Sequence, residues 1–111
     1  MGKSKGDRNM ARAFVIAWEF VLKQGAEEKF LAGYGPQGRW AQLFARAPGF
    51  IRSELARSEY DGHKFVTVDI WESRGAYDAF RKKYEAEYDL LDMEMSECTV
   101  NEQRVGSFYL E

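Results

Sequence analysis

Two carboxylates interrupt strongly apolar stretches of the sequence. Glu19 lies in AFVIAWEFVL, residues 13–22, and Asp69 lies in FVTVDIW, residues 65–71. Burial among apolar side chains raises the pKa of a carboxyl group, so that it can act as a base near neutral pH. Glu19 and Asp69 are therefore the candidate catalytic residues, each in the role of a general base.

The alternation of side chains along a strand predicts where these acids lie. One side of residues 65–71 is cleanly aliphatic and is expected to lie under helices: Val66, Val68 and Ile70. The other side carries Asp69 together with the candidate substrate-binding residues Phe65, Thr67 and Trp71. Glu19 belongs to the odd-numbered side of a predicted neighbouring strand. We therefore expect Glu19 and Asp69 to share the sheet face that lines a barrel.

A structural role for the two acids is the alternative. Each acid would then pair with an arginine on a strand and help to fix a dimer, and the available partners are Arg52, Arg57 and Arg104. Arg52 is also a candidate substrate-binding residue. Tyr34, beside the Gly-Pro-Gln-Gly loop, is another, because a polar-tipped aromatic side chain can close one end of a pocket.

The single histidine and the single cysteine are not expected to be catalytic. Histidine is a common general base, but His63 follows Asp61-Gly62 in a predicted hairpin turn. Cys98 continues an apolar helical stripe that begins at Tyr84, so we predict that it is a buried packing residue. With one cysteine and one histidine, a zinc or iron–sulfur site is not expected, and we predict neither metal nor cofactor.

Apolar periodicity predicts the element order βαββαβ. Strands are expected at residues 13–22, 50–58, 65–71 and 104–110, and helices at residues 26–47 and 74–98. The loop 33–38 should split the first helix, and one kink is expected in the second. This is the order of a ferredoxin-like α+β domain, with an antiparallel sheet covered by helices on one face.

Three local signals refine this outline. Asp61-Gly62 predicts a type I′ turn in a hairpin of the second and third strands. Ser73 is the predicted N-cap of the second helix. The polar residues 99–103 are expected to form a turn before the last strand.

Length and charge limit the class of protein. We divide the 111 residues into a flexible tail, residues 1–12, and a single domain, residues 13–111. The 16 basic and 18 acidic residues are mixed along the chain, so nucleic acid is not an expected partner. No apolar run reaches the length of about 20 residues that spans a membrane. The single cysteine and the lack of a secretion signal predict a cytoplasmic protein.

The first predicted strand is apolar on both sides. Helices on one face would leave the large side chains of the other face in water. We expect a second copy of the sheet to cover them, which gives a homodimer built as a dimeric α+β barrel.

Four segments of the chain resemble the antibiotic biosynthesis monooxygenase family of dimeric α+β barrels. They are VIAWEF, YGPQGRWAQLFARAPGF, DIWESRGAYDAF and RVGSF, and the likeness covers about residues 13–108. The resemblance implies chemistry without flavin or metal, in which a phenol, quinol or anthrone loses a proton and its anion reacts with oxygen. It also implies that Trp71, which matches the tryptophan at a strand end of the family, lines the pocket.

Two family features are absent from the sequence. Many members carry a histidine on the helix after that tryptophan, where this chain has Phe80 and Tyr84. The haem-degrading relatives carry an asparagine on the first strand, and this chain has none there. Both differences argue against haem binding.

Two classes of function remain open. The first is a cofactor-independent monooxygenase that acts on a small aromatic or quinol-type substrate in a pocket between sheet and helices. The second is a non-catalytic small-molecule-binding or structural dimeric module of the same fold. The resemblance favours the first class.

Overall fold

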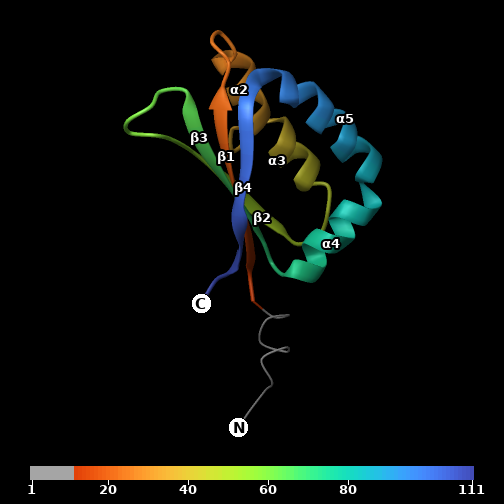
Figure 1. Cartoon of the computed structure of the whole chain (residues 1–111). Coiled ribbons are helices and arrows are strands. Elements are labelled where there is room, and N and C mark those ends of the chain that lie inside the picture. Colours follow the sequence, from red (N-terminus) through yellow and green to blue (C-terminus); the bar gives the residue numbers. More distant parts are fainter. Residues whose placement is uncertain (1–11) are drawn as a thin grey trace.

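Four antiparallel strands form one sheet, and the helices pack on one of its faces (Figure 1). The computed structural model describes residues 12–111, so the predicted tail lies outside the described residues except for Arg12. The elements in chain order are β1 (Phe14–Leu22), α2 (Glu27–Tyr34), α3 (Arg39–Phe44), β2 (Phe50–Arg57), β3 (Lys64–Trp71), α4 (Arg74–Lys83), α5 (Glu85–Met95), the short 3₁₀ helix η1 (Ser96–Cys98) and β4 (Thr99–Tyr109). The strand order is β2-β3-β1-β4, which confirms the predicted ferredoxin-like α+β fold.

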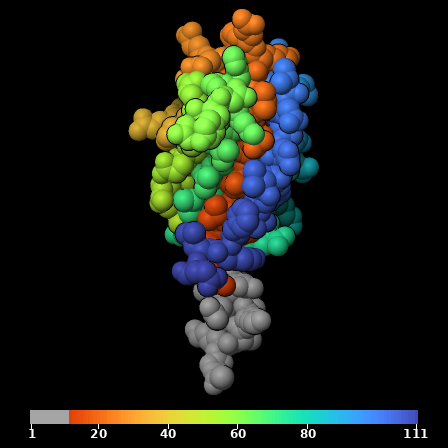
Figure 2. Space-filling view, turned by 60° about the vertical axis from the view of Figure 1, so that its left-hand side comes forward, coloured from red at the N-terminus to blue at the C-terminus, as the bar shows by residue number. Residues whose placement is uncertain are grey.

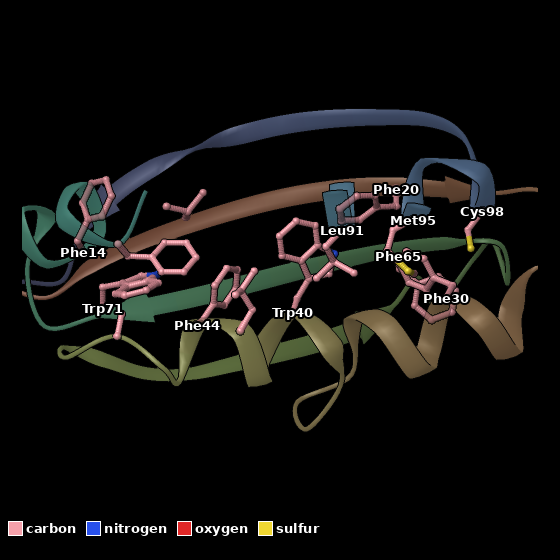
Figure 3. Close-up of a cluster of buried hydrophobic side chains, with 14 of the residues drawn as sticks. Phe14, Phe20, Phe30, Trp40, Phe44, Phe65, Trp71, Leu91, Met95 and Cys98 are labelled. Atoms are coloured by element: carbon pink, nitrogen blue, oxygen red, sulfur yellow. The ribbon is translucent and has the colours of Figure 1, made fainter. Parts of the chain in front are cut away.

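Aromatic side chains make the sheet face that the helices cover. In the β1–β3 pair, Phe14 lies opposite Trp71 and Phe20 lies opposite Phe65. The ring of Phe20 is 5.4 Å from that of Phe30 on α2. Figure 3 shows how this core extends along the sheet, with Phe14 and Trp71 at one end and Phe65, Met95 and Cys98 at the other. Trp40 and Phe44 of α3 lie between the two ends.

The predicted orientation of β3 is therefore wrong. The side expected under the helices lies on the opposite face, which we call the open face: Val66, Val68 and Ile70. The other side packs against the helices, since the Trp71 ring is 5.1 Å from Phe80 of α4. The physical reason is side-chain size, because aromatic rings fill the space between a sheet and a helix layer better than short β-branched side chains do.

The open face presents the four strands side by side in Figure 2, with β1 in red-orange between green β3 and blue β4. Its centre is small and aliphatic, with Val15, Ala17 and Val68. Phe108 of β4, opposite Val15, is 50% exposed. No helix of residues 12–111 packs on this face (Figure 1).

Several predicted details of the helical segments are confirmed. The first helical segment is split into α2 and α3 around Gly35 to Gly38, and the second is split at Tyr84. The Ser73 hydroxyl accepts a hydrogen bond from the backbone N–H of Ala76, so Ser73 is the N-cap of α4.

Two local predictions are wrong. Residues 99–103 form the first half of β4 instead of a turn, because their backbone pairs with β1 although their side chains are polar. The β2–β3 hairpin does form, but Asp61 and Gly62 do not have the positive φ of a type I′ turn. A longer loop connects the strands, in which the Ser58 hydroxyl accepts hydrogen bonds from the backbone N–H groups of Tyr60 and Asp61.

Candidate functional site

A cavity of about 130 Å³ lies between the sheet and the helices. Its walls come from all four strands and from α2, α3 and α5, and they consist of Trp18, Phe20, Tyr34, Trp40, Ala41, Phe44, Ser53, Thr67, Asp69, Tyr88, Asp92 and Glu102. An apolar cavity of about 150 Å³ holds one benzene ring. The enclosed part of this cavity thus has the size of a single aromatic ring.

Asp69 is the acid on the sheet wall of the cavity. Sheet register places Ser53 of β2 directly opposite Asp69 of β3, and the Ser53 hydroxyl donates a hydrogen bond of 2.7 Å to Asp69 Oδ1. Burial raises the pKa of Asp69 from 3.8 to about 6, and the hydrogen bond from Ser53 opposes that rise. A carboxyl group with this pKa is mainly ionised at neutral pH and is basic enough to take up a proton from a substrate during a reaction.

Two tyrosines from the helices face the same space. Burial raises the pKa of Tyr34 on α2, and the nearby carboxylates of Glu102 and Asp92 raise it further. Burial likewise raises the pKa of Tyr88 on α5 to about 12. Both phenols therefore stay protonated at physiological pH and can donate hydrogen bonds to a ligand.

One buried polar atom of the cavity wall has no standard hydrogen bond. The indole N–H of Trp40 has no acceptor in good hydrogen-bond geometry, although it lies close enough to Tyr34 to lower the pKa of that phenol slightly. Trp40 itself is 6% exposed. A buried donor without a full partner is costly, and a ligand oxygen would satisfy it.

The predicted pairing of Glu19 with Asp69 is wrong. Asp69 lies opposite Ile16 in the β1–β3 register, whereas Glu19 lies opposite Val66 on the open face. Glu19 forms an ion pair of 3.6 Å with Lys64. The error follows from the orientation of β3, since only one of the two acids points toward the helices.

Within one copy of the chain, neither acid of the described residues forms an ion pair with an arginine, and pairing across a dimer stays a prediction. Within residues 12–111, Arg52 pairs with Glu54 at 2.9 Å, and Arg57 pairs with Glu27 at 2.8 Å. Arg52 lies on the open face, outside the cavity.

The other predicted site residues divide into two groups. Thr67 and Tyr34 line the cavity. Phe65 and Trp71 are 2% and 0% exposed and belong to the core on either side of it, outside the lining. Trp71 contacts the rings of Phe44, Phe50, Tyr77 and Phe80.

Sequence reasoning missed several residues of the cavity wall. Trp40 and Tyr88 carry no distinguishing signal, because the apolar stripe of a helix is the same whether a side chain fills the core or borders a cavity. Ser53 is a polar residue between Ile51 and Leu55 in a strand, and this interruption is a signal that could have identified it. Trp18 carries no such signal, because it lies in an apolar run.

Comparison with known proteins assigns the family. Residues 13–87 match the antibiotic biosynthesis monooxygenase family. The chain belongs to this family. None of the curated proteins compared with the chain matches it significantly.

Solved structures of the same fold include relatives of this family. SnoaB, a cofactor-independent oxygenase from Streptomyces nogalater, has 19% identity and a TM-score of 0.71, with 91% of this chain and 95% of SnoaB covered. A protein from Shewanella oneidensis has 21% identity and a TM-score of 0.66, with 90% and 92% covered. A conserved protein from Methanosarcina mazei has 10% identity and a TM-score of 0.67, with 95% and 99% covered. At these identities the likeness establishes the fold.

Two features are absent from the described residues, a metal-binding cluster and a membrane-spanning helix. Residues 12–111 contain no group of three or more His, Cys, Asp and Glu side chains that is arranged to hold a metal ion. In the same range, no helix is both long enough and apolar enough to cross a membrane.

Proposed function

We propose that the chain is a cofactor-independent monooxygenase whose substrate is a small phenol or quinol bound in the cavity between sheet and helices. Asp69 is the general base that removes the proton of the substrate hydroxyl. The observation that carries this proposal is a half-buried carboxylate, with a pKa of about 6, on the wall of an aromatic cavity. Glu19 is not carried forward as a second base, because it lies on the open face.

The neighbours of Asp69 fit this role. Ser53 fixes one carboxylate oxygen, which leaves the other to accept the proton. Proton loss gives an electron-rich anion, which bonds through a ring carbon to molecular oxygen and takes back a proton to form a hydroperoxide. Loss of water then breaks the O–O bond and leaves one oxygen atom on the ring, which is oxidised to a quinone. The protonated phenols of Tyr34 and Tyr88 are placed to donate hydrogen bonds to the anion, and so is the indole N–H of Trp40.

The size of the cavity supports a small aromatic substrate. An enclosed volume of about 130 Å³ accepts one ring, and a larger substrate would extend into the open mouth. Aromatic walls provide the apolar contact and stacking surface that such a ring requires.

The experiment is oxygen consumption with a panel of hydroquinones by wild-type protein and by Asp69→Asn. The amide keeps the shape of the side chain and cannot act as a base, so kcat/KM should fall by about 10²–10⁴-fold. Asp78→Asn removes a charge from an exposed ion pair with Arg74 on α4 and serves as the control. Equal turnover by wild type and Asp69→Asn, or no turnover by wild type, would instead support the non-catalytic binding module.

We also propose that the protein is a homodimer in which two open faces pack together. The support is the aliphatic centre of the open face and the exposed Phe108 beside it. A cytoplasmic location remains a prediction from the cysteine content of the sequence.

A further inference from the structure

Charge is distributed unevenly around the cavity. Three carboxylates are on its wall, Asp69 from β3, Asp92 from α5 and Glu102 from β4. None of the lining residues within the described part of the chain is Lys, Arg or His. The chain as a whole is nearly neutral, so this local excess of negative charge is a property of the cavity.

The carboxylates act on the interior of the cavity. Asp92 and Glu102 both raise the pKa of Tyr34, which shows that their charges reach the phenol at the cavity wall. Glu102 is partly buried and accepts a hydrogen bond of 3.1 Å from the Thr99 hydroxyl, so its position is fixed.

Two arginines act on tyrosines near the cavity from outside its lining. The guanidinium of Arg81 stacks on the ring of Tyr88, 3.6 Å from the ring centroid. Arg81 and Arg104 both lower the pKa of Tyr77, a residue that does not line the cavity. Arg81 also lowers the pKa of Tyr88, which does line the cavity, and its Nη1 is buried without a hydrogen-bond partner. The two arginines therefore reduce the negative potential of the cavity, but neither of them is a lining residue.

Aromatic faces form most of the remaining wall. The rings belong to Trp18, Phe20, Tyr34, Trp40, Phe44 and Tyr88. The face of an aromatic ring carries negative charge density and attracts cations, which adds to the attraction of the carboxylates. Aromatic rings combined with carboxylates are the surroundings that suit an organic ammonium group.

We propose that the cavity selects aromatic ligands that carry a protonated amine, and that it rejects ligands that carry a carboxylate. The aromatic ring occupies the enclosed space beside Asp69, and the ammonium group lies between Asp92 and Glu102. This inference deepens the proposed function, on which it rests, because it names the chemical class of the substrate for the same cavity.

The test is calorimetric binding of three compounds that share a phenol ring and differ in charge: tyramine, para-ethylphenol and para-hydroxyphenylpropanoate. At neutral pH and low salt, tyramine should bind about tenfold or more tightly than para-ethylphenol, because the partly buried Glu102 and the exposed Asp92 both attract the ammonium group. The propanoate should bind about tenfold or more weakly than para-ethylphenol. Added salt should reduce both differences.

Matched variants identify which carboxylates cause the selectivity among the three compounds. The double variant Asp92→Asn, Glu102→Gln should bring the three affinities much closer together, because Asp69 is then the only carboxylate left among the lining residues. Asp89→Asn, on the same helix α5 but outside the lining, should keep the wild-type order. Circular dichroism verifies that each variant is folded.

The possible results separate this inference from the proposed function. Equal binding of the three compounds by wild type, preference for the propanoate, or binding of none of them would overturn the inference. Loss of selectivity in Asp89→Asn would overturn it too, since net charge alone would then explain the order. Selective binding of tyramine, with no oxygen consumption on the hydroquinone that bears the same side chain, would support the inference and reject the oxygenase.

Discussion

The hydrogen bond from Ser53 to Asp69 sets the pH at which the proposed base works. Ser53 stabilises the ionised carboxylate and so lowers a pKa that burial raises to about 6. In Ser53→Ala the pKa of Asp69 should rise further, and the acidic limb of the kcat/KM profile should move to higher pH. Ser107→Ala, at an exposed serine of β4, is the control. A limb that stays in place, or moves to lower pH, would contradict the role of Asp69.

Asp69 should also make stability depend on pH. Its pKa is raised from 3.8 to about 6, so the folded state holds a proton that the unfolded state releases, and stability is lost as pH rises through that window. Since each pKa unit is worth about 1.4 kcal/mol, Asp69→Asn should be up to about 3 kcal/mol more stable than wild type at pH 7, and the gain should vanish near pH 4. Urea unfolding at both pH values measures this difference.

The surface acid Glu94 gives stability the opposite dependence on pH. Hydrogen bonding to Arg39 lowers the pKa of Glu94, so the stability due to Glu94 is present at high pH and lost as pH falls. Glu94→Gln should therefore lose stability at pH 7 relative to wild type, where Asp69→Asn gains it.

A gain of stability near pH 4 for Asp69→Asn, equal to that at pH 7, would mean that packing and not charge is responsible.

The sequence predicted part of the site at this scale. Asp69 was identifiable because an acid within an apolar strand is unusual, and Tyr34 because it adjoins a glycine-rich loop. The hydrogen bond between Ser53 and Asp69 could not be predicted. It depends on the register of β2 against β3, which no local signal specifies. Asp92 and Glu102 could not be identified either, because an acid in a polar stretch of sequence looks the same whether or not it borders a cavity.

At the scale of elements, the junction of α2 and α3 positions two walls of the cavity. Gly38 precedes α3, and a Cβ there would lie 2.6 Å from the backbone oxygen of Ala32 and 2.8 Å from that of Gly33. Backbone atoms cannot move aside without shifting the helix that carries Tyr34. Gly38→Ala should therefore lower the free energy of unfolding by about 1–3 kcal/mol.

Urea unfolding measures this effect, and the hairpin loop offers a matched control. A Cβ at Gly62 has no heavy atom within 4 Å, and Gly62 does not have a positive φ. Gly62→Ala should be close to neutral. If Gly38→Ala were equally neutral, close packing at the α2–α3 junction would not be a determinant of stability.

The element order was predictable, but the orientation of β3 was not. Hydrophobic alternation separates the two sides of a strand only where one side is polar. In β3 both sides are largely apolar. Hydropathy alone therefore could not decide whether the side of Val66 or the side of Thr67 faces the helices. Size decides instead, since Phe65 and Trp71 reach the helices.

At the scale of the whole molecule, the open face predicts the oligomeric state. Light scattering should give twice the chain mass of 12.9 kDa. Val68→Lys places a charge at the centre of the open face, so it should give a folded monomer. Met93→Lys adds the same charge at a residue of α5 that is 70% exposed, and it should remain dimeric. A wild-type mass of one chain would reject the dimer.

The two faces of the sheet divide the residues of β1 and β3 into alternate sets. Trp18, Phe20 and Thr67 belong to the cavity, whereas the intervening Ala17, Glu19 and Val66 belong to the open face. The two sets can therefore vary independently. A library of substitutions restricted to the cavity set would change which ligand binds and leave self-association unchanged. The deletion of one residue in the middle of β3 would exchange the two sets beyond that point, and both properties would be lost together.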